Sequence, residues 1–141
     1  MKQNIVERKI MWGDLDSMGI VFYPRYYEWI DACSHLFFES IDLNLVKLTE
    51  KMHLGFGLAE SSCIYIKPGR YHQTVKIITQ LEELNEKTVK LKHFIHNTSN
   101  NELMVTGLEK RICMDVSNPE NLMAINIPEK IYSILKTALD K

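Results

Sequence analysis

The sequence lacks the cysteine spacing of a disulfide framework or a zinc site. Cys33, Cys63 and Cys113 are odd in number, widely separated and free of any CxxC pattern. This arrangement indicates neither a disulfide framework nor a cysteine zinc site. We interpret the three thiols as buried apolar groups, and we expect no bound metal.

The sequence also lacks an excess of charge of one sign and a long apolar run. The formal net charge of -1 argues against a broad electrostatic surface for nucleic acid or anionic membranes. No run approaches the roughly 18 apolar residues that span a bilayer, and residues 1–12 carry charges where a signal peptide would have its apolar core. We therefore expect a cytoplasmic protein with no nucleic-acid partner and no membrane insertion.

Signatures of common nucleophiles and metal sites are missing as well. There is no GxSxG motif, and Ser61 and Ser62 fall within or beside a predicted strand rather than on a strand-to-helix turn. His93 and His96 are three apart in another predicted strand, so their side chains should point to opposite faces. We interpret His93 as a core or interface histidine with satisfied hydrogen bonds.

What the sequence does have is the composition of a single globular domain. Hydrophobic residues make up 45% and charged residues 25% of 141 positions, which are ordinary values for a globular protein. A chain of this length buries a core without disulfide or metal support. No linker, repeat or low-complexity tract divides it, so we expect one domain over residues 1–141.

Hydrophobic periodicity predicts one long helix among several strands. Pro24 suits the first turn of a helix, and apolar residues then recur at spacings of three and four as far as Ser40. Strands are predicted at 4–11, 58–66, 71–84, 87–96 and 103–116, and further helices at 43–51 and 127–141. Short connections at 84–87 and 97–101 favour an antiparallel meander. The wide apolar face of the long helix needs a sheet curled around it, which makes the fold class α+β.

Asp14 and Asp16 lie in the loop that leads into the long predicted helix. Aspartates in such loops commonly cap a helix or turn the backbone. However, residues 19–23 should bring free backbone N–H groups to the positive end of the helix, where a carbonyl oxygen gaining negative charge is stabilised. A carboxylate facing such a site suffices to hydrolyse a thioester, because it can attack the carbonyl or deprotonate a water. No metal or cofactor is required.

Residues 12–32, WGDLDSMGIVFYPRYYEWIDA, resemble the signature of the 4-hydroxybenzoyl-CoA thioesterase family, GDxDxxGIVxYPxYxxWxDA. A looser likeness joins residues 65–71, YIKPGRY, to a Y-x-K-P-A-R stretch of related acyl-CoA thioesterases. The resemblance implies a hot-dog fold, in which a curled antiparallel sheet surrounds one long helix. It also implies a homodimer or homotetramer with active sites at the dimer interface, hydrolysing an acyl-CoA to a free acid and coenzyme A.

The resemblance assigns roles to individual residues. It makes Asp16 the catalytic carboxylate and the backbone N–H of Tyr23 the donor that polarises the thioester carbonyl. Asp31, inside the helix, either touches the acyl group or bonds neighbouring backbone. The residues expected at the acyl pocket are Phe22 and Tyr26, together with Gly55 and Phe56 from the partner subunit. Plain core packing is an equally good interpretation of Tyr26.

Two departures from the family pattern bear on the substrate. Gly55-Phe56-Gly57 stands where the Pseudomonas-type enzyme has Gly-Thr-Pro, which predicts a more apolar wall and disfavours a phenolic acyl group. The turn at 85–87 replaces a more basic run, so Lys87 and Lys90 are the candidates for the phosphates of coenzyme A. An ordinary solvated face explains these lysines equally well. Coenzyme A enters only as part of the substrate.

Two alternative functions remain open on the sequence. The first is a thioesterase that acts on acyl groups carried by acyl carrier protein, which would reach the same slot through a protein surface. The second is a non-catalytic module that binds acyl-CoA or another protein. An intact Asp16 followed by Gly19 favours an enzyme, because a binding module has no need to hold a carboxylate beside an oxyanion site. The length of the acyl group and its aromatic or aliphatic nature stay open too.

Overall fold

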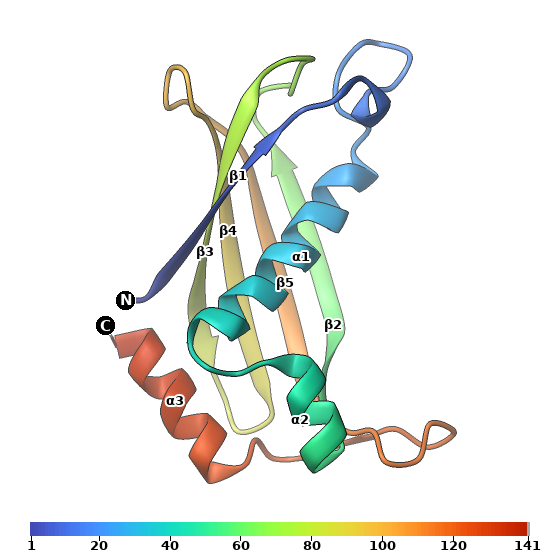
Figure 1. Ribbon diagram of the computed structural model, residues 1–141, viewed down its shortest axis with the longest axis vertical. Helices are drawn as coiled ribbons and strands as arrows, with labels where there is room; N and C mark the ends of the chain where they lie inside the picture. Colours follow the sequence, from blue (N-terminus) through green and yellow to red (C-terminus); the bar gives the residue numbers. More distant parts are fainter. Residues whose placement is uncertain (141) are drawn as a thin grey trace.

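The computed structural model describes residues 1–140 and shows one curled antiparallel sheet wrapped around a long helix (Figure 1). The strands are β1 (Gln3–Lys9), β2 (Leu54–Tyr65), β3 (Thr74–Leu84), β4 (Thr88–Asn97), β5 (Leu103–Asp115) and the short β6 (Met123–Ala124). The helices are α1 (Pro24–Ser40), α2 (Leu45–Met52) and α3 (Glu129–Asp140), with a single 3-10 turn at Trp12–Asp14. The predicted α+β class is confirmed.

The strand order is β1-β3-β4-β5-β2, with β6 paired to β5. The tight hairpins predicted between β3 and β4 and between β4 and β5 are confirmed. The meander does not extend to β2, because β1 pairs with β3 and occupies that edge. Strand β2 therefore lies at the opposite edge of the sheet, beside β5. It also begins at Leu54, four residues before the predicted start.

Helix α1 carries the apolar face that the sheet encloses. Its buried residues recur at the helical period: Tyr26, Trp29, Ile30, Cys33, Ser34, Phe37 and Phe38. Two apolar clusters divide the core between the ends of the helix. One cluster surrounds Ile30 near the start of α1, and the other surrounds Phe37 and takes in Leu135 from α3. The sheet and helix thus hold the loop before α1 at one end of the molecule (Figure 1).

The cysteines are not paired, and they differ in burial. All three cysteines are free thiols, and Cys33 and Cys113 are buried as expected. Cys63 is only partly buried, because β2 is an edge strand that β5 covers on one side. Within residues 1–140, no helix has the length and apolar character needed to cross a bilayer.

Candidate active site

The loop before α1 holds Asp16 in a fixed orientation. Its Oδ1 atom accepts a hydrogen bond from the backbone N–H of Met18 at 2.8 Å and a long one from Ile20 at 3.5 Å. Gly19 has a φ of 76° and donates to the Asp16 carbonyl at 3.0 Å, a turn that favours glycine. Asp16 therefore turns the backbone with one oxygen, while Oδ2 has no hydrogen-bond partner among residues 1–140.

Asp14 has a different role from Asp16, although the two lie close in sequence. The Asp14 side chain is buried, and its Oδ2 accepts from the backbone N–H of Met11 at 2.9 Å. Its Oδ1 lies 3.7 Å from Arg8 and 3.8 Å from Arg25. The backbone carbonyl of Asp14 accepts from Phe22 at 2.8 Å, which ties the loop to the start of α1. This placement fits the structural interpretation of Asp14.

The backbone at the N-terminus of α1 leaves one donor free. The N–H groups of Val21 and Phe22 are bonded to the carbonyls of Gly69 and Asp14, at 2.9 and 2.8 Å. Pro24 has no N–H, so the N–H of Tyr23 is the donor that remains without an acceptor among the described residues. The sequence predicted several free N–H groups over 19–23, and the structure reduces them to this one because the loop satisfies the others.

A hollow of about 440 Å³ brings Asp16 and Tyr23 together. The loop before α1 forms one side, and the connection from β2 to β3 forms the other. Its lining residues are Asp16, Met18, Ile20, Val21, Tyr23, Tyr26, Tyr65, Ile66, Lys67, Pro68 and Gly69. The lining is mainly apolar and aromatic, with one carboxylate and one ammonium group. This composition suits an acyl group that is positioned by a few polar contacts.

Tyr26 serves both the core and this hollow. Its ring is buried against Trp29, with centroids 5.2 Å apart. Burial raises the pKa of Tyr26 to about 12, against the smaller effect of a backbone hydrogen bond from Gly69. A Cβ placed on Gly69 would lie 2.8 Å from the Tyr26 hydroxyl, so glycine is needed for this close approach. Tyr26 therefore presents a neutral hydroxyl at the wall of the hollow.

The other expected acyl-pocket residues lie outside this hollow. Phe22 is exposed and packs edge-on against Tyr23, with ring centroids 5.6 Å apart. Gly55 and Phe56 belong to β2, and the ring of Phe56 is 7% exposed and stacked on Phe38 in the core. The sequence argument for an apolar wall does not hold for this chain, because the Phe56 ring faces the core. The argument against a phenolic acyl group rested on that apolar wall, so it no longer applies.

Asp31 forms an ion pair that neither sequence alternative included. Its Oδ1 accepts from Arg111 Nη2 at 2.6 Å and lies 3.7 Å from His35 Nε2. Arg111 also donates to the backbone carbonyl of Phe56 at 3.3 Å. Asp31 and the Phe56 backbone, which the sequence placed at the pocket, therefore meet through Arg111. The sequence analysis did not single out Arg111.

The two lysines assigned to coenzyme A lie far from Asp16 within one chain. Lys87 lies in the turn between β3 and β4, and Lys90 lies in β4 just after it. This turn is at the opposite end of the molecule from the loop before α1 (Figure 1). Lys90 is paired with Glu83 at 3.4 Å. Lys67 lies at the hollow itself. Lys87 and Lys90 can therefore approach this hollow only from another subunit.

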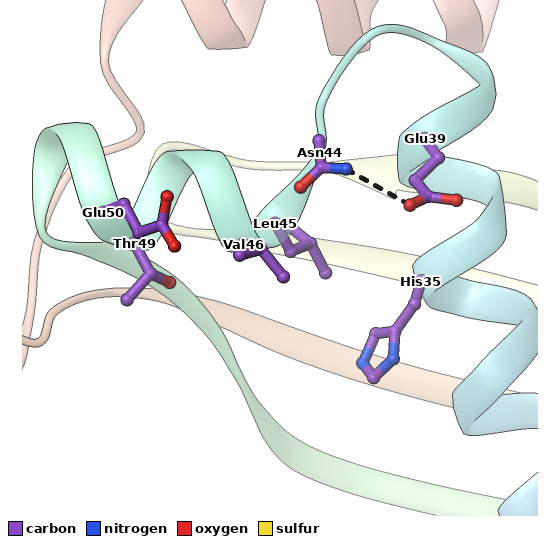
Figure 2. A pocket seen from close by; sticks show the side chains of 7 residues that line it. All are labelled: His35, Glu39, Asn44, Leu45, Val46, Thr49 and Glu50. Carbon is purple, nitrogen blue, oxygen red and sulfur yellow. Dashed lines mark hydrogen bonds between the residues drawn. The ribbon is translucent and has the colours of Figure 1, made fainter.

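A second hollow of about 460 Å³ lies between α1 and α2. Figure 2 shows His35 on α1 at one side of this hollow and Leu45 and Val46 on α2 at the other, with Glu39 bonded to Asn44 beside the loop that joins the helices. Asp16 is not among the residues that line this hollow. Within residues 1–140, no group of three or more histidine, cysteine or acidic side chains is placed to hold a metal ion.

Comparisons with known proteins identify relatives over most of this chain. The model of the thioesterase-like superfamily matches residues 10–135. The chain is 26% identical over 128 residues to a 4-hydroxybenzoyl-CoA thioesterase of Pseudomonas sp. (strain CBS-3), covering 87% of this chain and 90% of that protein.

Two solved structures have the same fold. A gentisyl-coenzyme A thioesterase superposes with a TM-score of 0.81 at 27% identity, covering 94% of this chain and 99% of the other. A 4-hydroxybenzoyl-CoA thioesterase variant in complex with 4-hydroxybenzoyl-CoA gives a TM-score of 0.88 at 22% identity, covering 96% and 99%. Since the family match spans most of its length, this chain belongs to the thioesterase-like superfamily and is a thioester hydrolase with a hot-dog fold.

Proposed function

We propose that this acyl-CoA thioesterase hydrolyses the coenzyme A ester of an aromatic acid, with Asp16 and the N–H of Tyr23 as its reacting groups. The observation that carries the proposal is that Asp16 and Tyr23 line one hollow, where a carboxylate oxygen and a backbone N–H both lack a partner among residues 1–140. Tyr23, Tyr26 and Tyr65 give this hollow aromatic walls. The relatives named above act on hydroxylated aromatic acyl groups.

The geometry supports a short reaction sequence. The thioester carbonyl oxygen binds the Tyr23 N–H, and the α1 dipole favours the negative charge that develops there. Asp16 Oδ2 then takes a proton from a water that attacks the carbonyl carbon, or attacks that carbon itself to give an anhydride that water later opens. In either route the carbon–sulfur bond breaks, the thiolate leaves, and the free acid forms.

The open edge of β2 supports assembly into a homodimer. In the part of the chain that the structure describes, strand β2 pairs only with β5, and it carries exposed apolar side chains at Leu58, Ile64 and Tyr65. A long apolar edge of this kind is a template for pairing with another strand. The other edge, β1, is shorter and carries Glu7, Arg8 and Lys9.

Pairing two β2 edges antiparallel would complete the active site. It would set the Gly55–Leu58 end of one strand beside Tyr65 of the other, next to the hollow that holds Asp16. Gly55, the Phe56 backbone and the Asp31 carboxylate of one subunit would then approach the acyl group bound by its partner. Lys87 or Lys90 would meet the phosphates of coenzyme A, and a homotetramer could form by pairing dimers.

An acyl carrier protein ester remains the second candidate substrate, because its thioester would enter the same hollow. One experiment separates the candidates: release of free thiol from benzoyl, 4-hydroxybenzoyl, phenylacetyl and straight-chain acyl groups, each carried by coenzyme A and by acyl carrier protein. We expect turnover to be highest with an aromatic CoA ester. Faster turnover on the protein carrier would favour the alternative, and no turnover with any ester would make a non-catalytic acyl-CoA-binding module the better explanation.

A further inference from the structure

A network of buried polar side chains joins helix α1 to the sheet, and the reaction sequence above makes no use of it. Its members are Ser34 on α1, Thr79 on β3, His93 on β4, and Glu109 and Arg111 on β5. All five are buried within an otherwise apolar core. Burying a polar group costs free energy unless the group is hydrogen-bonded. Each of the five side chains therefore needs a partner inside the core.

The hydrogen bonds of His93 fix the inner half of the network. Ser34 donates its hydroxyl proton to Glu109, so its oxygen accepts from His93 Nε2, 3.2 Å away. His93 Nε2 therefore carries a proton. His93 Nδ1 lies 2.8 Å from the Thr79 hydroxyl, which completes the chain of contacts. The interpretation of His93 as a satisfied core histidine is consistent with these contacts.

The carboxylate of Glu109 is held between this chain and Arg111. Burial raises the pKa of Glu109, but the neighbouring His93 ring, the hydrogen bond from Ser34 and the charge of Arg111 outweigh that effect and lower the pKa overall. Arg111 Nη2 lies 3.1 Å from Glu109 Oε2, and Arg111 Nε lies 3.3 Å from Oε1. This two-point contact fixes the plane of the guanidinium group.

Arg111 also contacts Asp31, which lies nearer the surface. The Arg111 side chain is 4% exposed, whereas that of Asp31 is 48% exposed, and their contact at 2.6 Å joins the buried network to the surface. One guanidinium thus serves two carboxylates. The contacts of Asp31 use its Oδ1 atom, so Oδ2 remains able to accept a hydrogen bond from a ligand.

We infer that Arg111 is a positioning residue that fixes the Asp31 carboxylate as a hydrogen-bond acceptor for a hydroxyl group on the acyl part of the substrate. The inference rests on the proposed function, because it needs the Asp31 surface to face the acyl group bound by the partner subunit. Glu109 with Ser34 and His93 sets the plane of Arg111, and Arg111 sets the direction of Asp31. Discrimination between hydroxylated and plain aromatic esters is then the property that the network controls.

The test compares kcat/KM for 4-hydroxybenzoyl-CoA and benzoyl-CoA in the wild type, Arg111→Lys, Asp31→Asn and Asp31→Glu. The ratio of the two values should fall at least about tenfold in Arg111→Lys, because lysine keeps the charge but cannot make the two-point contact. Asp31→Glu should lower the ratio as far as Asp31→Asn, because it keeps the charge and displaces the carboxylate. Ser34→Ala acts one step further from Asp31: it weakens the hold on Glu109 and leaves the contact between Arg111 and Asp31 in place, so it should lower the ratio less than Arg111→Lys does.

Each outcome bears on the inference separately from the proposed function. A ratio that Arg111→Lys leaves unchanged, or that Asp31→Glu preserves while Asp31→Asn loses it, overturns the positioning role. An equal loss of turnover on both esters in Arg111→Lys and Ser34→Ala shows a purely structural network and overturns it as well. If Arg111→Lys does not fold, the comparison of Asp31→Glu with Asp31→Asn decides alone. Wild-type protein with no activity on any ester would instead contradict the proposed function.

Discussion

Glu109 shows how a buried charge is held inside this protein. Its carboxylate is nearly inaccessible to solvent and accepts bonds from Ser34 and Arg111. A buried carboxylate without such partners would take up a proton to lose its charge. In this protein the partners lower the pKa of Glu109, so the folded state favours the ionised carboxylate.

This ionisation predicts a specific dependence of stability on pH. The folded-state pKa of Glu109 lies below its ordinary value of 4.5. Its contribution to the free energy of unfolding is therefore complete above pH 4.5 and is lost as the pH falls through the folded-state pKa. Thermal unfolding of the wild type and Glu109→Gln across this range should show a smaller acid-induced loss in the variant. Parallel curves would contradict the account of Glu109.

Residues close in sequence were the predictable part of the site. Asp16, Gly19 and Tyr23 lie within one short segment, so their spacing alone brings a carboxylate near the start of a helix. Arg111 could not be found in that way, because its partners come from α1, β2 and β5. One local signal was available: Glu109 and Arg111 share the buried face of β5 with Gly107 and Cys113, at every second residue. Charges at that period mark a network in the core.

At the level of elements, helix α1 and strand β2 do most to shape the site. The segment before α1 folds back so that Val21 bonds to Gly69 after β2, at 2.9 Å. Ile20 and Arg70 form an isolated antiparallel bridge beside this contact. The hollow exists because these two connections lie side by side. The period of apolar residues predicted α1 from Pro24 to Ser40 correctly, since propensity and packing agree there.

The place of β2 was harder to predict from the sequence. The predicted strand began at residue 58, and the residues before it include Gly55 and Gly57, which are poor strand formers. In the structure they are strand residues that face β5 closely, and a Cβ on Gly57 would lie 2.8 Å from Met114 Sδ. Strand β2 pairs with β5 because β1 already pairs with the free edge of β3. This pairing joins residues far apart in the sequence, so no local pattern predicts it.

The free edge of β2 predicts a difference between two lysine substitutions. Leu58 in β2 is 51% exposed and Ile5 in β1 is 55% exposed, so each change should cost the isolated chain little. We expect Leu58→Lys to shift the protein toward monomer and to lower its activity, because a charge would enter the paired edge. Ile5→Lys is the matched control and should leave the mass unchanged. Light scattering after size exclusion measures both, and a Leu58→Lys protein of wild-type mass would argue against pairing through β2.

At the scale of the whole molecule, one chain separates the groups that the proposed reaction would use. Asp16 and Tyr23 lie at one end, while Lys87 and the turn between β3 and β4 lie at the other (Figure 1). Asp31 and Arg111 lie apart from the hollow in the same chain. An antiparallel pair of subunits would bring the two sets together, which is why catalysis and assembly are expected to depend on each other.

The central claim is that Asp16 does chemistry rather than merely turning the backbone. The direct measurement is single-turnover thiol release from 4-hydroxybenzoyl-CoA by the wild type, Asp16→Asn and the neighbouring control Asp14→Asn, with the affinity for the ester measured in parallel. Asparagine preserves the turn that Oδ1 makes and removes the charge. We predict that Asp16→Asn binds the ester as the wild type does and releases thiol about 10²-fold more slowly or worse, while Asp14→Asn chiefly loses thermal stability. An Asp16→Asn protein that turns over the ester at the wild-type rate would contradict the account.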